Sequence, residues 1–236
     1  MNRSELVQRA VWVAVYMLFI LAPMLAMLLG AVPPGRGNWT EFSIALGYSG
    51  LALMGLQFGL TARFRHVTRP WGEDVIYHFH RRISLIAVAL VVAHPSILVA
   101  TGSDKLAMPH SLAELPLGAV FAMISLGSVL TLVVTALWRT QLRISYELWH
   151  ATHIVLAVCA VGGGLLHMVG WGFYLADPWK RGLWIAITLF WIGLLAYVRL
   201  IKPLFMLRRP YGVAEVRAER GACPTVVMEP QGHAGF

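Results

Sequence analysis

Six apolar stretches, each long enough to cross a bilayer, constrain this chain more than any other feature of its sequence. An α-helix needs about 20 residues to cross a hydrocarbon core of about 30 Å. The stretches cover residues 9–31, 41–62, 76–101, 116–138, 147–171 and 182–205. The sequence therefore predicts an all-α membrane protein, a bundle of six transmembrane helices that is followed by a short β segment at the C-terminus.

The composition fits a chain whose solvent is lipid. Hydrophobic residues make up 58% of the 236 residues and charged residues only 13%, whereas a soluble domain usually carries about 25% charged residues. The net charge of +8 does not indicate a nucleic-acid partner, because the basic residues lie in short clusters between apolar runs. Lipid is the partner that this composition implies.

Lysine and arginine residues are distributed unequally between the two sides of the predicted bundle. With the N-terminus inside, the inner segments hold thirteen: Arg3, Arg9, Arg63, Arg65, Arg69, Arg81, Arg82, Arg139, Arg143, Arg199, Lys202, Arg208 and Arg209. The outer loops hold four: Arg36, Lys105, Lys180 and Arg181. Because cytoplasmic loops carry the excess of positive charge, we expect a multi-pass protein of a bacterial inner (plasma) membrane with both termini in the cytoplasm.

Four of the nine histidines repeat one spacing on two predicted helices. His80 and His94 lie fourteen residues apart in the third stretch, and His153 and His167 lie fourteen apart in the fifth. Fourteen residues are close to four helical turns, or about 21 Å, so both members of a pair face nearly the same way. Because both helices run outward, we expect His80 level with His153 and His94 level with His167.

Two imidazoles at one level can hold one iron, and the interior of a helix bundle is a known place for such sites. The spacing therefore predicts two b-type haems, one near each face, with the four histidines as axial metal ligands. No CxxCH sequence is present for covalent attachment, so coordination and packing must hold each haem. With both axial positions filled, iron has no vacant site for substrate and acts as a one-electron relay.

The remaining histidines are predicted not to bind iron. His78 and His150 face other sides of their helices, while His66, His110 and His233 lie in loops or in the tail. An intramembrane histidine can also simply bond a neighbouring helix or line a proton pathway.

Two neighbouring clusters each have two interpretations. Arg81 and Arg82, directly after His80, suit haem propionates as cofactor-binding residues, and they equally suit anchoring at the inner face. The glycines at 162–164 would let either a flat ring or a neighbouring helix approach closely.

These residues resemble a known family. The carriers are His80-Arg81-Arg82 with His94, the run Arg143-Ile144-Ser145-Tyr146-Glu147-Leu148-Trp149 leading to Thr152-His153, and His167. They resemble the ferric reductase-like transmembrane family, which includes ferric-chelate reductases and NADPH oxidases. The resemblance covers the second to sixth stretches and extends into the tail.

The polar tail contains two short alternating runs, 213–217 and 225–228, which predict two strands joined by a turn. Residues 209–236 resemble the opening of the FAD-binding barrel that follows the membrane domain in this family, and residues 1–208 resemble that membrane domain. The resemblance implies that FAD and NAD(P)H bind in a missing C-terminal part or in a flavoprotein partner. We therefore expect the chain to be a fragment of a longer flavoenzyme or the haem-relay part of one.

The resemblance implies a membrane oxidoreductase that passes electrons from a cytoplasmic flavin/NAD(P)H donor to an extracytoplasmic acceptor, either ferric iron or oxygen. The outer half of the second stretch, 41–51, lacks the arginine found there in some oxidases of the family, which weakens a superoxide-generating role. One alternative is a haem subunit that passes quinol electrons to a periplasmic reductase partner. Another is a proton or ion pathway without haem.

Overall fold

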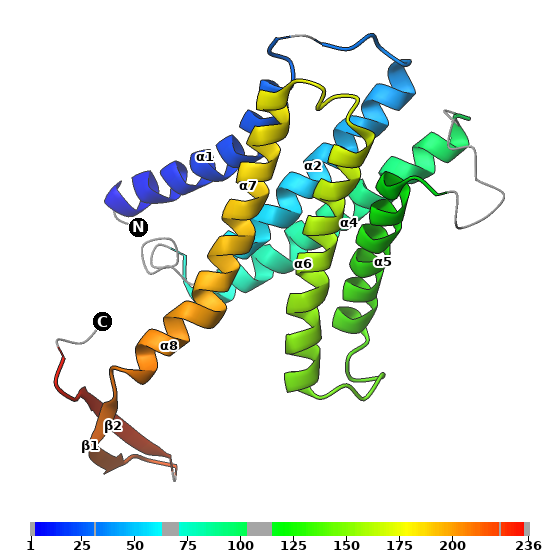
Figure 1. Ribbon diagram of the computed structural model, residues 1–236. Coiled ribbons are helices and arrows are strands. Elements are labelled where there is room, and N and C mark those ends of the chain that lie inside the picture. Colours follow the sequence, from blue (N-terminus) through cyan, green and yellow to red (C-terminus); the bar gives the residue numbers. More distant parts are fainter. Residues whose placement is uncertain (1–2, 31, 63–70, 103–114, 222, 234–236) are drawn as a thin grey trace. The chain divides into compact units, whose positions relative to one another are not determined.

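The computed structural model describes residues 3–30, 32–62, 71–102, 115–221 and 223–233, and the chain divides into two compact units. The first unit, Met1–Ile192, is helical, and Figure 1 shows its helices in chain order. They are α1 (Arg3–Ala26), α2 (Asn38–Leu60), α4 (Glu73–Ala100), α5 (Leu117–Leu137), α6 (Tyr146–Trp171) and α7 (Pro178–Ala196), whose last turn belongs to the second unit. Within the described residues, six helices are long and apolar enough to cross a membrane. The predicted all-α membrane fold is confirmed.

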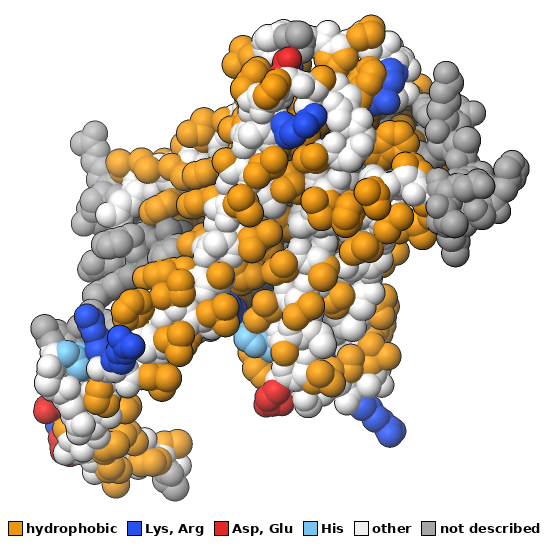
Figure 2. Space-filling model, in the orientation of Figure 1, with side chains coloured by type: hydrophobic (Ala, Val, Ile, Leu, Met, Phe, Trp, Pro, Cys, Tyr) orange, Lys and Arg blue, Asp and Glu red, His pale blue; other side chains and the backbone are white. Residues whose placement is uncertain are grey.

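The central helix of the bundle is its least hydrophobic one. Helix α2 has a mean hydropathy of 1.3, the lowest among the candidate spans in the described part of the chain, yet half of it is buried. Thr40, Ser43 and Gln57 are all buried along it. In contrast, Figure 2 shows hydrophobic side chains over the visible face of the helices. Lipid accepts apolar side chains on the outside, so small and polar residues concentrate where helices meet.

Helices α5 and α6 pack closely because glycine removes the side chain at their contact. A Cβ atom at Gly163 would lie 3.2 Å from the carbonyl oxygen of Phe121 and from the backbone nitrogen of Ser125. The Ser125 hydroxyl donates a hydrogen bond of 2.7 Å to the carbonyl of Ala160 across the same contact. Gly164 faces Leu51 of α2, whereas Gly162 has open space beside it. Helix packing therefore accounts for Gly163 and Gly164, and approach of a flat ring remains an interpretation for Gly162 alone.

Helix α1 ends earlier than hydrophobicity predicts. The apolar stretch continues to residue 31, but the helix stops at Ala26 and the chain turns through Gly30, whose φ is 74°. Lys180 of α7 donates a hydrogen bond of 3.1 Å to the carbonyl of Met27 and lies 3.4 Å from the Asp177 carboxylate. A cation at a helix C-terminus is favourable. A contact with a distant residue thus sets this boundary, which the local sequence does not reveal.

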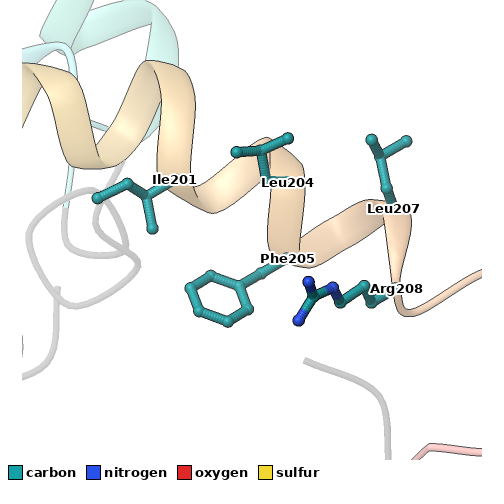
Figure 3. Close-up of a pocket in the computed structure, with 5 residues that line it drawn as sticks. All are labelled: Ile201, Leu204, Phe205, Leu207 and Arg208. Carbon is teal, nitrogen blue, oxygen red and sulfur yellow. The ribbon is translucent and has the colours of Figure 1, made fainter.

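The second unit, Gly193–Phe236, continues from the end of α7 through the π-helical turn η2 (Tyr197–Ile201) and α8 (Lys202–Leu207). The wide turn has a cause in Pro203, which has no N–H to donate to the carbonyl four residues before it. In this turn the backbone N–H of Lys202, the residue before Pro203, bonds to the carbonyl of Tyr197, five residues earlier. Along α8 an open pocket of about 380 Å³ is lined by Ile201, Leu204, Phe205, Leu207 and Arg208 (Figure 3).

The tail of this unit forms the predicted hairpin. Strand β1 (Tyr211–Ala218) pairs antiparallel with β2 (Pro224–Pro230), with an irregularity between Val213 and Glu215. Most of its side chains are exposed, including the Arg217–Glu215 ion pair of 2.7 Å. Two strands alone are only marginally stable in water.

The glycine contact between α5 and α6 can be tested with matched substitutions. In Gly163→Val, the new side chain meets rigid backbone on α5, and overpacking of this kind costs about 1–3 kcal/mol. The control is Gly127→Val on α5, where a Cβ has nothing within 4 Å. We expect chemical unfolding in detergent to show the loss only for Gly163→Val. Equal stability of the two variants would contradict this description of the contact.

Candidate functional site

The four histidines predicted as ligands lie on α4 and α6 and meet in two pairs. The rings of His94 and His167 have centroids 6.3 Å apart, with 63° between their planes. At the other level, His80 and His153 lie close enough to interact electrostatically. The structure therefore brings the His94 and His167 rings together and places His80 and His153 within electrostatic range of each other, while the role of all four as ligands stays a prediction.

Each imidazole of the His94–His167 pair is anchored through its Nδ1 atom. His94 Nδ1 lies 2.9 Å from the carbonyl oxygen of Ser43, and His167 Nδ1 lies 2.9 Å from that of Gly118. Because a carbonyl oxygen can only accept, Nδ1 must carry the hydrogen in both rings. Each Nε2 atom then keeps its lone pair, which is the arrangement that metal-binding histidines usually have.

Close backbone approach makes the anchor of His167 possible. A Cβ atom at Gly170 would lie only 2.9 Å from the Cα atom of Gly118, so the start of α5 contacts the end of α6 directly. This contact brings the Gly118 carbonyl within reach of His167, which lies one turn before Gly170.

The anchor of His94 also depends on small residues. Ser43 and Gly47 lie four residues apart, on one face of α2. A Cβ atom at Gly47 would lie 3.2 Å from the His94 ring. Four helices, α2, α4, α5 and α6, thus position one pair of imidazoles.

The His80–His153 pair has different surroundings. His80 Nδ1 is buried and has no hydrogen-bond partner among the described residues. The ring of Trp149 lies 5.2 Å from that of His153, and the Arg139 guanidinium lies 5.7 Å from the Trp149 ring. The two levels therefore offer unlike environments to whatever they hold.

The spacing of the His94–His167 pair suits one metal ion held from two sides. A metal–imidazole bond is about 2.0 Å and the nitrogen lies about 1.1 Å from the ring centroid, so two opposed ligands have centroids about 6.2 Å apart. The observed separation is 6.3 Å. The described residues contain no group of three or more His, Cys, Asp or Glu side chains that could hold a metal. The separation of the two rings therefore fits two imidazoles that bind one haem iron.

The other residues considered from the sequence lie away from these pairs or outside the described residues. His78 is exposed, and His150 stacks on Tyr146 with ring centroids 5.7 Å apart. His233 belongs to the second unit, where its Nε2 lies 3.1 Å from the carbonyl oxygen of Pro210. Arg81 and Arg82 are exposed, which suits both interpretations of them. His66 and His110 lie outside the described residues.

A polar cluster close in sequence to Ser43 has no signature in the sequence. The Tyr174 hydroxyl lies 2.6 Å from both carboxylate oxygens of Glu41, and the backbone N–H of Arg36 donates a bond of 3.0 Å to the same carboxylate. The Arg36 guanidinium lies 4.2 Å from the centroid of the Phe173 ring. This cluster joins the loop after α6 to the first turn of α2. Tyr174 and Glu41 are 133 residues apart, so no local pattern in the sequence predicts their contact.

The fold and the paired histidines define a class: a multi-pass membrane protein whose helices present two imidazole pairs to the bundle interior. The family model described as "Ferric reductase like transmembrane component" matches residues 46–164, half of the chain, and the chain belongs to this family. Membership implies oxidoreductase activity and transmembrane electron transfer in general terms. The match includes His80, His94 and His153 but ends before His167, which is linked to His94 by the contact of their rings and to His153 by the repeated spacing. Neither the curated proteins nor the solved structures gave a match.

The Tyr174–Glu41 contact should stabilise the bundle. In Tyr174→Phe the carboxylate loses a donor, and a hydrogen bond to a charged group contributes about 1.5–3 kcal/mol. Because Tyr174 is only partly buried, we expect a loss of about 1 kcal/mol in chemical unfolding. Tyr146→Phe, at an exposed ring on α6, is the control. No difference between the two variants would show that the contact contributes nothing.

The same contact should depend on alkaline pH. Burial, and then the Glu41 carboxylate, raise the pKa of the Tyr174 hydroxyl. The protonated phenol is therefore favoured in the folded state, and its stabilisation is complete below the ordinary value of about 10. It is lost as the pH rises through the raised pKa. Difference absorbance between wild type and Tyr174→Phe should show this phenol ionising above its usual pH. Ionisation at or below about pH 10 would contradict the assignment.

Proposed function

We propose that this chain carries electrons across a membrane through two b-type haems, one held by His80 and His153 and the other by His94 and His167. The observation that carries the proposal is the 6.3 Å separation of the His94 and His167 rings, together with the anchoring of both Nδ1 atoms. Each bound haem supplies an iron that changes between the ferric and ferrous states by one electron.

The chain's own residues would do three things for this chemistry. The imidazoles of His80, His94, His153 and His167 would bind the two irons, which would keep substrate away from the metal. The anchored Nδ1 atoms fix ring orientation before the metal binds, so little rearrangement accompanies electron transfer. The helices place the two levels fourteen residues apart on α4, about 21 Å along its axis, so one long electron transfer becomes shorter ones.

The anchoring favours this proposal over a haem-free proton pathway. A relay histidine accepts a proton at one ring nitrogen and releases it from the other. In His94 and His167 the Nδ1 hydrogen is donated to a backbone carbonyl oxygen, which is too weak a base to take up the proton, so release from Nδ1 has no onward acceptor there.

Donor and acceptor follow from family membership as proposals. We propose a cytoplasmic flavin/NAD(P)H donor, in a further domain or a flavoprotein partner, and an extracytoplasmic acceptor, ferric iron or oxygen. The orientation follows the distribution of basic residues, with both termini in the cytoplasm of a bacterial inner membrane. We further propose that residues 1–208 form the membrane domain and 209–236 the opening of an FAD-binding barrel, which the β1–β2 hairpin supports. Arg81 and Arg82 are proposed as partners of the propionates of the haem at the His80 level.

Haem content tests the proposal directly. We expect purified wild type to bind two haems b, with a b-type Soret band and α-band in the reduced-minus-oxidised spectrum. His94→Ala and His167→Ala should each lose the same haem and retain the other, and His80→Ala and His153→Ala should lose the second. His78→Ala and His150→Ala should retain both. A wild type without a b-type spectrum after haem supplementation would overturn the proposed function.

Electron transfer across a bilayer is tested in liposomes that enclose ferricyanide. With dithionite outside, liposomes holding wild-type protein should bleach the enclosed ferricyanide far faster than empty liposomes. His167→Ala should slow bleaching by at least about tenfold, because one of two relay positions is lost and the remaining transfer distance grows. Equal rates for wild type and empty liposomes, or proton conductance by haem-free protein, would favour the alternative of an ion pathway.

A further inference from the structure

Ser43 and His94 make a set of reciprocal contacts that goes beyond a single anchor. The Ser43 hydroxyl donates a hydrogen bond of 2.7 Å to the backbone carbonyl of His94. The imidazole Nδ1 of His94 lies 2.9 Å from the Ser43 carbonyl oxygen and 3.1 Å from its Oγ atom. Ser43 is fully buried, with no exposed surface. Backbone and side chain of one residue thus hold both the backbone and the ring of the other.

The direction of each hydrogen follows from the chemistry of the groups. The hydroxyl has one hydrogen, and the His94 carbonyl takes it. The lone pairs of Oγ then face Nδ1, whose hydrogen is shared between two oxygen atoms of the same residue. Both oxygens draw the Nδ1 hydrogen, which increases electron density on the ring and makes Nε2 a stronger donor to a metal.

The other level lacks an equivalent arrangement at His80. Its Nδ1 atom is buried without a hydrogen-bond partner among the described residues. A more basic ligand stabilises ferric iron over ferrous iron, because the ferric ion carries the greater charge. Unlike hydrogen bonding at the two levels should therefore give the two irons unlike potentials.

We propose that Ser43 is a positioning residue that fixes the His94 ring and, through it, lowers the reduction potential of the haem at the His94–His167 level. This inference rests on the proposed function, since it assigns a role toward the haem that the histidines would hold. Ser43 itself touches neither the metal nor a substrate. It acts through the orientation and basicity of His94.

The test is potentiometry of purified protein that contains both haems, followed by visible and electron paramagnetic resonance spectra. In Ser43→Ala the backbone carbonyl still anchors His94, so both haems should remain. The potential of one haem should rise, with a change of up to about tenfold in the ferric-to-ferrous preference, which is about 59 mV for one electron. The other haem should keep its potential, and the low-spin ferric signal of the first should shift as its ring turns.

Matched variants separate this role from general packing. Ser43→Thr keeps the hydroxyl and should restore the wild-type potential. Ser43→Cys fills a similar volume with a weaker acceptor for the Nδ1 hydrogen and a weaker donor, so it should shift the same haem in the same direction by less. It replaces Ser43→Ala if that variant does not fold. Ser49→Ala is the control, because the Ser49 hydroxyl bonds the Ala45 carbonyl of its own helix at 2.7 Å and lies 3.2 Å from the Met24 sulfur of α1, away from the histidines. It should change neither potential.

The outcomes distinguish the two proposals. A wild type without haem b would overturn the proposed function and this inference with it. Two bound haems with potentials that stay unchanged in both Ser43→Ala and Ser43→Cys would overturn the role of Ser43 alone. Equal shifts in Ser43→Ala and Ser49→Ala would also overturn it, since the effect would then belong to α2 as a whole.

Discussion

The anchoring of buried imidazoles to backbone carbonyls is the interaction on which the rest of the described bundle depends. Lipid offers no partner to a ring N–H, so a buried imidazole in a span is stabilised when it finds a partner inside the protein. His94 and His167 use the carbonyls of Ser43 and Gly118, which belong to α2 and α5 rather than to the helices that carry the histidines. The requirement therefore draws four helices together. It also leaves the lone pair of each Nε2 atom available to bind a metal.

The glycines and the buried polar residues of the interior follow from that requirement. A carbonyl can reach a ring on another helix only if the backbones approach closely, and a side chain larger than hydrogen would separate them. Gly118 meets Gly170 beside His167, and Gly47 makes room for the His94 ring. The least apolar span, α2, is for the same reason the most buried.

Periodic features of this chain could be predicted from its sequence, and features made by distant contacts could not. The spacing of His80 and His94, and of His153 and His167, repeats a helical period, so the pairing between helices followed from geometry. The hairpin of the tail followed from alternation. The end of α1 did not, because Lys180 sets it from 153 residues away. The Glu41–Tyr174 contact could not be predicted either. The role proposed for Ser43 could not, because nothing in the local sequence distinguishes this serine, and its contacts with His94 form only where α2 packs against α4.

The unequal anchoring of the histidines at the two levels affects the direction of electron transfer. With the proposed orientation, an electron leaving the cytoplasm moves from the His80 level to the His94 level. If Ser43 lowers the reduction potential at the His94 level, that contribution alone makes the transfer from the His80 level unfavourable. A negative cell interior favours outward movement of the electron. One charge moved through 100 mV gains about 2.3 kcal/mol, and the two levels span about 21 Å of a core of about 30 Å, so this step gains about 1.6 kcal/mol. A tenfold penalty costs about 1.4 kcal/mol. Outward transfer thus stays favourable in an energised membrane, while the more reducing outer level delivers the electron with greater driving force to its acceptor.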